Sequence, residues 1–206
     1  MIAIIDYDAG NMKSVEKALL LLGEQVMFTR DREEILHADG VILPGVGAFG
    51  HAMDNLHRYN LVPAIEEVVE KNTPFLGICL GLQLLFEESE ENPGVSGLGI
   101  LKGSIRRIPP KPELKIPHMG WNSLELKHDG RLFRGISGVP YVYFVHSYYL
   151  QAADERIVTA TTQYSTSIDA SVEQGNVFAC QFHPEKSSDT GLKILHNFAD
   201  IVKGES

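Results

Sequence analysis

A cysteine held between two glycines is the feature of this sequence best suited to chemistry. The segment Gly77-Ile78-Cys79-Leu80-Gly81 comes directly after the apolar run at residues 75–78. This order of strand, sharp turn and helix is that of a nucleophile elbow, with Cys in place of Ser. Glycines keep the backbone clear of a strained turn residue, and the start of a helix favours a thiolate. The segment predicts a nucleophilic thiol; a buried cysteine in a tight turn is the alternative.

A histidine and a glutamate late in the sequence could complete this chemistry. The segment Gln181-Phe182-His183-Pro184-Glu185 ends a strand-like run, and residues two apart in an extended chain project to the same side. His183 could take the thiol proton and later protonate a leaving amine, while Glu185 fixes the imidazole tautomer. The alternative is a strand-end histidine beside a surface glutamate.

A glycine-rich turn supplies a third candidate group. The segment Pro44-Gly45-Val46-Gly47-Ala48-Phe49-Gly50 again follows an apolar run. Such a turn can aim backbone N–H groups at one point and stabilise the oxyanion of a tetrahedral intermediate. Phosphate binding is less favoured because the segment is not GxxxxGK[ST] and no lysine follows it. A plain connection between a strand and a helix is the remaining alternative.

Strand-like and helix-like patterns alternate through the first half and would position these groups. We expect strands at residues 2–5, 26–28, 41–43 and 75–78, and helices at residues 11–23, 63–72 and 80–88. Asp31 and Glu34 form a predicted capping box for one more short helix. This rhythm predicts a mostly parallel sheet with helices on both faces. Ligands of such folds bind beyond the carboxyl ends of the strands, where Pro44 and Cys79 fall.

The second half predicts antiparallel additions to that sheet. Strands are expected at residues 104–108, 141–145, 157–161, 168–173 and 177–182, and Gln174-Gly175-Asn176 reads as a hairpin turn. An amphipathic helix at residues 192–202 closes the chain. We find neither an internal repeat nor a linker, so we expect one mixed α/β domain over residues 1–206.

Composition excludes several other classes of protein. The net charge of −9 argues against nucleic acid as the main partner, because phosphate binding needs clustered Lys and Arg. No apolar run is long enough to cross a bilayer, and the first residues resemble a strand rather than a signal peptide, which favours a cytoplasmic protein. No His or Cys spacing is convincing for a metal site, so we expect no metal and no cofactor.

Five motifs occur in order over essentially the whole chain: PGVGAFG, GICLGLQLLF, PHMGWN, YFVHSYY and FHPEKS. Together they resemble the class I (triad) glutamine amidotransferases, which have a flavodoxin-like α/β fold. GICLG and HPE mark the class as a whole. PGVGAFG and PHMGWN are similar to the subfamily of glutaminase subunits of imidazole glycerol phosphate synthase, from histidine biosynthesis. The resemblance implies hydrolysis of glutamine through a cysteine thioester.

The resemblance also implies roles for individual residues. Cys79 would be the nucleophile, His183 the general acid and base, and Glu185 the third member of the triad. The amides of Val46 and Leu80 would form the oxyanion hole. Contacts with glutamine are implied for Gly47, Gln83, His146, Ser147 and Tyr148. A face that docks the partner is implied for Asn11, Trp121, Tyr143 and Lys186. His146 could instead be a satisfied strand-end histidine, and Trp121 could belong to the core.

The partner implied by the resemblance is a (β/α)₈-barrel cyclase subunit, which forms a heterodimer with this chain and receives its ammonia. Low glutaminase activity is then expected for the lone chain. Three alternatives stay open: a glutaminase that serves another synthase, a non-catalytic regulatory scaffold of the same fold, and a cysteine hydrolase of another amide. The second cysteine, Cys180, lies on a predicted buried strand and is expected to be chemically quiet.

Overall fold

One long mixed sheet forms the centre of the molecule. The computed structural model describes residues 1–10, 12–127 and 130–205. Five parallel strands come first, in the order β2 (Val26–Thr29), β1 (Ile2–Ile5), β3 (Gly40–Leu43), β4 (Phe75–Ile78) and β13 (Val177–Cys180). This arrangement confirms the predicted mostly parallel sheet, and it places a strand from the end of the chain beside β4.

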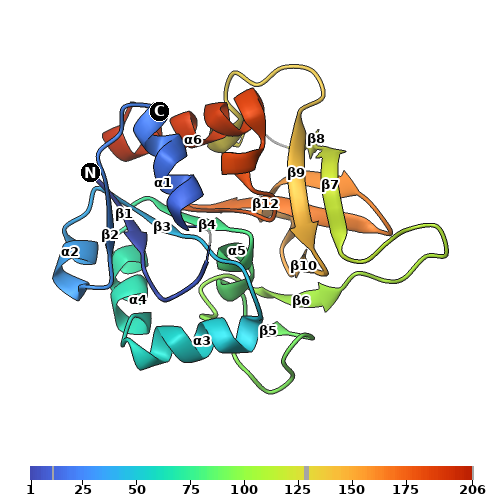
Figure 1. Ribbon diagram of the computed structural model, residues 1–206, viewed down its shortest axis with the longest axis horizontal. Helices are drawn as coiled ribbons and strands as arrows, with labels where there is room; N and C mark the ends of the chain where they lie inside the picture. Colours follow the sequence, from blue (N-terminus) through green and yellow to red (C-terminus); the bar gives the residue numbers. More distant parts are fainter. Residues whose placement is uncertain (11, 128–129, 206) are drawn as a thin grey trace.

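Antiparallel strands extend this sheet, as predicted. After β13 come β12 (Ser167–Gln174), β10 (Tyr148–Ala152) and β6 (Gly103–Arg107), while β5 (Glu88–Ser89) pairs parallel with β6. A branch carries β11 (Val158–Gln163) and β8 (Glu125–Leu126). A separate antiparallel pair, β7 (His118–Ser123) and β9 (Tyr141–His146), stands at the right of Figure 1.

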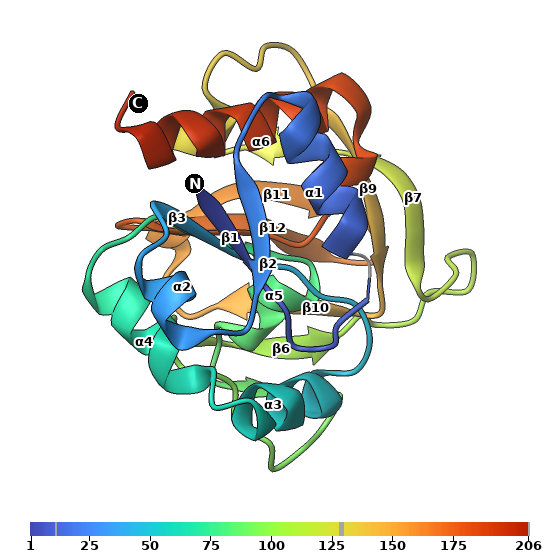
Figure 2. The same ribbon diagram turned by 60° about the vertical axis from the view of Figure 1, so that its left-hand side comes forward.

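Helices cover both faces of the sheet because β1 alternates its side chains between them. Ile2 and Ile4 pack with α1 (Met12–Leu21) and α6 (Ser188–Lys203), which lie together above the sheet in Figure 2. Ala3 and Ile5 share a core with α2 (Arg32–Leu36), α3 (Phe49–Arg58), α4 (Val62–Glu70) and α5 (Leu80–Leu84). Short 3₁₀ turns occur at Arg131–Phe133, Glu155–Ile157 and Pro184–Lys186. No helix in the described ranges is long and apolar enough to cross a membrane.

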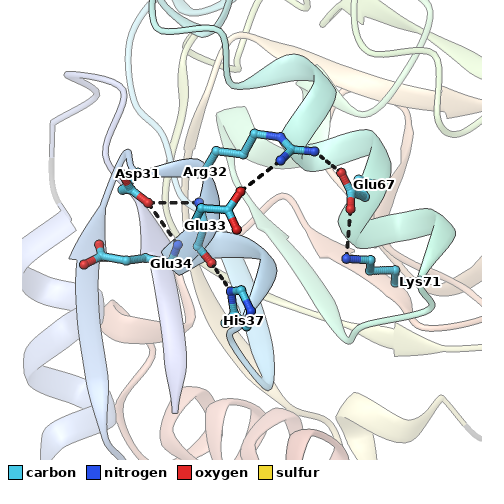
Figure 3. A network of polar contacts seen from close by, with 7 residues as sticks. All are labelled: Asp31, Arg32, Glu33, Glu34, His37, Glu67 and Lys71. Carbon is cyan, nitrogen blue, oxygen red and sulfur yellow. Dashed lines mark hydrogen bonds and ion pairs between the residues drawn. The ribbon is translucent and has the colours of Figure 1, made fainter.

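The predicted capping box of α2 is half correct. The Asp31 carboxylate accepts the N–H groups of Glu33 and Glu34, at 2.9 and 3.1 Å, as an N-cap should (Figure 3). The predicted contact from the Glu34 side chain back to the Asp31 N–H is wrong. Thr29, the last residue of β2, accepts the Asp31 N–H at 2.9 Å and donates its hydroxyl to the Glu34 carboxylate. Thr29, at the end of β2, thus accepts the Asp31 N–H that the sequence prediction assigned to Glu34 of α2.

An ion-pair chain sets α2 against α4. Arg32 contacts the carboxylates of Glu33 and Glu67, and Glu67 also binds Lys71 at 2.8 Å (Figure 3). Exposed pairs of this kind contribute at most about 1 kcal/mol each. Burial of Ile35, fully covered in the core, contributes roughly 1.5–3 kcal/mol and is the larger effect.

Among the elements that differ from the sequence prediction are α5, β7 and β10. Helix α5 ends at Leu84 instead of residue 88, because the Leu84 carbonyl accepts the Leu98 N–H at 2.8 Å and the chain turns toward β5. Strand β7 is not among the predicted strands, but it pairs with β9 over its whole length. Strand β10 was missed because the run from Tyr141 to Leu150 is split at Ser147 between the small sheet and the main sheet.

Candidate active site

Cys79 lies in the sharp turn between β4 and α5. Its φ of +55° and ψ of −106° are strained values for a residue with a side chain. A Cβ on Gly77 would lie 2.8 Å from the Gly81 carbonyl oxygen, and one on Gly81 would lie 1.8 Å from the Leu43 carbonyl oxygen. The two glycines are therefore required by close backbone contacts, which confirms the elbow predicted from the sequence.

The adjacency of β4 and β13 brings His183 to the cysteine. Cys180 pairs with Ile78, and the Cys79 N–H donates to the Cys180 carbonyl oxygen at 2.8 Å. Three residues after Cys180, the Nδ1 atom of His183 bonds the Glu185 carboxylate at 2.8 Å. Both side chains are almost completely buried, at 2% and 0% exposure. Residues about a hundred positions apart are thus joined at the carboxyl ends of neighbouring strands.

The environment of His183 favours the imidazolium ion. Burial lowers the pKa of His183, but the nearby Cys79 thiol, the hydrogen bond from Nδ1 to Glu185 and the negative charges of both groups outweigh it, so the pKa rises to about 9. Because Glu185 occupies Nδ1, the buried Nε2 is the nitrogen left for the sulfur. A thiol, an imidazole and an orienting carboxylate in this order can perform nucleophilic and general acid–base catalysis.

Gln181 is a residue of this site that the sequence reasoning did not assign. Its Nε2 donates to the Cys79 sulfur at 3.7 Å, and its Oε1 accepts from Gln83 Nε2 at 3.0 Å. It is fully buried at the end of β13. Its place in the motif, two residues before His183, is the signal that could have identified it. An amide N–H directed at sulfur stabilises a thiolate.

The other cysteine has no access to such chemistry. Cys180 is fully buried, and its sulfur faces the Phe182 carbonyl oxygen at 3.5 Å. Burial raises the pKa of Cys180 well above its usual value, with smaller contributions from the charges of Glu185 and Cys79. The neutral thiol is a poor nucleophile, in agreement with the expectation that this residue is quiet.

A cavity of about 350 Å³ opens onto the Cys79 thiol. It is lined by every residue proposed for the oxyanion hole and for glutamine: Val46, Gly47, Leu80, Gln83, His146, Ser147 and Tyr148. The sequence reasoning missed Glu91, which lines the same cavity and accepts the Phe49 N–H at 2.8 Å. Because Glu91 stands in a surface-like acidic run, nothing in the sequence separates it from its neighbours.

The glycine-rich loop at residues 44–50 blocks part of the predicted oxyanion hole. The Leu80 N–H donates to the Gly45 carbonyl oxygen at 3.3 Å. The Tyr7 hydroxyl holds the start of the loop through the Pro44 carbonyl oxygen at 2.6 Å, and burial raises the Tyr7 pKa. Val46, at 37% exposure, lies at the cavity wall. In this state Leu80 faces a carbonyl oxygen and would meet an oxyanion only after the loop moves.

His146 uses both ring nitrogens inside the protein. Nδ1 bonds the Tyr148 carbonyl oxygen at 2.8 Å, and Nε2 bonds His118 Nδ1 at 3.0 Å. Burial lowers the pKa of His146 to about 3. The ring therefore lines the cavity without a spare N–H, which agrees with the satisfied histidine that the sequence left open. His118 was not assigned from the sequence.

Trp121, Tyr143 and Lys186, which are proposed to dock the partner, are on or beside the small sheet. Trp121 of β7 is 53% exposed and stacks edge-on with Tyr143 of β9, with ring centroids 6.2 Å apart. Its exposure excludes the core alternative. Lys186 is exposed directly after the triad, and Asn11 lies outside the described residues. Two further exposed apolar or aromatic side chains, Met119 and Tyr141, belong to the same two strands.

A metal centre finds no support in the described part of the chain, where no group of three His, Cys, Asp or Glu side chains is suited to hold an ion.

Comparison with known proteins agrees with this geometry. A family model described as "Glutamine amidotransferase class-I" matches residues 3–202. "Imidazole glycerol phosphate synthase subunit HisH" of Moorella thermoacetica is 54% identical over 98% of this chain and 95% of its own length. The protein of the same description from Methanocaldococcus jannaschii is 49% identical over 98% of this chain and all of its own length.

Solved structures share the fold at lower identity. A chain described as "Crystal structure of glutamine amidotransferase" superposes with a TM-score of 0.76 at 22% identity, over 99% of this chain and all of that one. "Structure of PurLQS from Thermotoga maritima" gives a TM-score of 0.74 at 18% identity, over 98% of both chains. These two similarities concern the fold alone.

Proposed function

This chain belongs to the class-I glutamine amidotransferases, and from its relatives and its site we infer that it is the glutaminase subunit of imidazole glycerol phosphate synthase. It hydrolyses glutamine to glutamate and ammonia. The observation that carries this conclusion is the buried set of Cys79, His183 and Glu185, gathered at the ends of adjacent strands with Cys79 at the wall of a cavity. The reaction serves histidine biosynthesis.

The proposed cycle begins with a thiolate paired with an imidazolium. The Cys79 sulfur attacks the side-chain carbonyl carbon of glutamine and forms a tetrahedral oxyanion. His183, protonated below its pKa of about 9, gives its proton to the departing ammonia, and a glutamyl thioester remains. His183 then takes a proton from water as the water attacks the thioester. Glutamate leaves, and the thiolate and the imidazolium are restored.

We propose that the oxyanion hole forms when the planar peptide group between Gly45 and Val46 flips. The Gly45 carbonyl and the Val46 N–H belong to the same peptide group, and at present the carbonyl accepts the Leu80 N–H. Rotation by about half a turn would free the Leu80 N–H and direct the Val46 N–H toward the same point. Gly47, with φ of +111°, gives the loop the conformational freedom for this change.

The cavity supplies contacts for the amino acid as well as for its amide. The Glu91 carboxylate suits the α-ammonium group of glutamine, since opposite charges attract strongly in a partly desolvated site. Gln83 and the Ser147–Tyr148 segment also line the cavity, where amide, hydroxyl and backbone groups can bond the substrate. Gly47 and His146 complete the wall.

The ammonia requires a second protein. The cyclase subunit of the synthase is the proposed partner in a heterodimer, docked on a surface that includes Trp121, Tyr143, Lys186 and Asn11. In support, the exposed aromatic side chains of β7 and β9 suit a protein interface. A sheltered channel would keep ammonia unprotonated until it reaches the cyclase. We also propose that residues 1–206 act as one domain and that the pair works in the cytoplasm, where free glutamine is available.

Replacement of the nucleophile tests this function. In the complex with the cyclase, Cys79→Ala should abolish glutamine-dependent synthesis and leave ammonia-dependent synthesis unchanged. The matched control is Cys180→Ala, which removes the other buried sulfur and should retain glutamine-dependent turnover within about tenfold, since it costs packing rather than chemistry. Retained glutamine-dependent synthesis in Cys79→Ala would refute the assignment.

A further inference from the structure

A pair of buried histidines, one of which lines the glutamine cavity, lies outside the triad. His118 of β7 and His146 of β9 are cross-strand partners, and their rings bond through Nδ1 of His118 and Nε2 of His146 at 3.0 Å. They are 3% and 6% exposed. His118 is stacked between the rings of Phe144 and Tyr164, with centroids 4.7 and 4.0 Å away. The proposed reaction uses neither imidazole as an acid or a base.

The direction of every hydrogen bond in this pair is set by its neighbours. A carbonyl oxygen only accepts, so His146 Nδ1 donates to the Tyr148 carbonyl oxygen. A neutral His146 must then accept at Nε2, which makes His118 Nδ1 the donor and His118 Nε2 an acceptor. Asn122 donates to that Nε2 at 3.3 Å and gives its other amide hydrogen to the Gln163 carbonyl oxygen at 2.9 Å. Both rings are therefore fixed in the Nδ1–H tautomer.

The chain of bonds crosses from one sheet to the other at the cavity. Asn122 and His118 belong to the small sheet, whereas Tyr148 begins β10 of the main sheet. The Tyr148 carbonyl oxygen also accepts from Gln83 Nε2 at 3.1 Å, and Gln83 is linked through Gln181 to the Cys79 sulfur. The pair thus connects the strand that carries Trp121 with the wall of the glutamine cavity.

Neutrality is a requirement of this arrangement. Burial lowers the pKa of His118 to about 4 and that of His146 to about 3. A second imidazolium here would repel the protonated His183, whose charge is one of the influences on His146. It would also set an N–H donor against another donor, because His118 Nδ1 already donates to His146 and the Asn122 amide already donates to His118.

We propose that His118 is a positioning residue for glutamine binding, which acts through His146 to hold the Ser147–Tyr148 wall of the cavity. His118 itself does not line the cavity. Loss of its donor leaves His146 Nε2 unsatisfied, so the His146 ring and the Tyr148 carbonyl oxygen that it holds lose their fixed position. This inference rests on the proposed glutaminase function, because the binding that it affects is that of glutamine.

Two substitutions separate hydrogen bonding from packing. His118→Phe keeps a ring between Phe144 and Tyr164 but removes both nitrogens. His118→Asn gives up the ring and retains an amide donor near the position of Nδ1. In the complex with the cyclase, we expect KM for glutamine to rise about tenfold in His118→Phe, to return to within about threefold of wild type in His118→Asn, and kcat to change less than KM. Ammonia-dependent synthesis by the cyclase should be unchanged in both.

Tyr164→Phe is the matched control, because it keeps the stacking ring and removes only the hydroxyl bond to the Lys115 carbonyl oxygen. Its KM should equal that of wild type. A tenfold rise in His118→Asn equal to that in His118→Phe, or an unchanged KM in His118→Phe, would overturn the proposal and leave the pair a purely structural feature.

Histidine-selective ¹⁵N NMR of the wild-type chain at neutral pH tests the same proposal without activity and without a variant that could fail to fold. It should show His118 and His146 neutral, each with a proton on Nδ1. A proton on Nε2 of His146, or an imidazolium signal from either ring, would overturn the proposal. If the wild-type complex does not hydrolyse glutamine, the proposed function fails. The tautomers of His118 and His146 still test the chain of hydrogen bonds by itself.

Discussion

At the scale of single residues, glycines decide where side chains can react. Gly77 and Gly81 permit the close backbone contacts of the turn that holds Cys79. The sequence pattern alone predicts that geometry. Gly45 has a different role. A Cβ there would lie 2.2 Å from the Tyr7 hydroxyl and 3.0 Å from the Leu80 Cβ atom, so the loop approaches both residues only because this position has no side chain.

The variant Gly45→Ala should therefore lower kcat for glutamine hydrolysis by about a hundredfold, because the loop that carries the Val46 amide is displaced. The double variant Gly45→Ala with Tyr7→Phe should recover part of that loss, since the hydroxyl is the atom nearest to the added methyl group. Steady-state kinetics of the complex with the cyclase, measured for wild type, Gly45→Ala, Tyr7→Phe and the double variant, complete this double-mutant cycle. Equal activity of Gly45→Ala and of the double variant with Tyr7→Phe would show that Tyr7 does not set the loop position.

At the scale of elements, strand ends assemble the site. The alternation of strands and helices predicted the parallel core and located Cys79 and Pro44 at its carboxyl edge. Local patterns could not show that β13 pairs with β4, because that pairing joins segments about a hundred residues apart. The elbow and the carboxyl-edge location follow from local physics, whereas the assignment of the triad needed family resemblance. Gln181, Glu91 and His118 escaped notice because their roles depend on such long-range neighbours.

Strand β9 also supports His183, the proposed catalytic histidine. Ser187 Oγ accepts the Tyr143 N–H at 2.9 Å and donates to the His183 carbonyl oxygen at 2.6 Å, and the His183 N–H bonds the Tyr143 carbonyl oxygen at 2.9 Å. The strand proposed to meet the cyclase is therefore bonded to the backbone of the triad.

We expect Ser187→Ala to lower kcat about tenfold and the free energy of unfolding by about 1–3 kcal/mol, because two backbone groups lose their partner. Ser171→Ala is the control. Ser171 is equally buried and donates to the Ala179 carbonyl oxygen at 2.9 Å, away from the triad. Urea unfolding should show a loss of stability for both variants, and kinetics a loss of kcat for Ser187→Ala alone. An unchanged kcat in Ser187→Ala would contradict this account of β9.

At the scale of the whole molecule, the buried histidines make stability depend on pH. In the unfolded chain these rings gain a proton near pH 6.5, but in the folded protein His118 does so near pH 4 and His146 near pH 3. Between those values the unfolded state binds more protons. The stabilising effect of the neutral rings is thus complete above about pH 6.5 and is lost as the pH falls.

Each histidine should contribute a slope to the free energy of unfolding that approaches, at most, about 1.4 kcal/mol per pH unit near pH 5. In His118→Phe the total slope should decrease by the contribution of this one histidine. Urea unfolding of wild type and of His118→Phe at several pH values measures it. The same slope in wild type and His118→Phe would show that His118 is not buried in the neutral form.

The central claim of this account is that the Cys79 sulfur carries the glutamyl group during turnover. The most direct measurement is acid quenching of the complex with the cyclase during turnover of labelled glutamine, followed by peptide mapping. The account predicts label on the peptide that contains Cys79, lost in Cys79→Ala. Label on the Cys180 peptide, or an unlabelled Cys79 peptide while ammonia is produced, would contradict it.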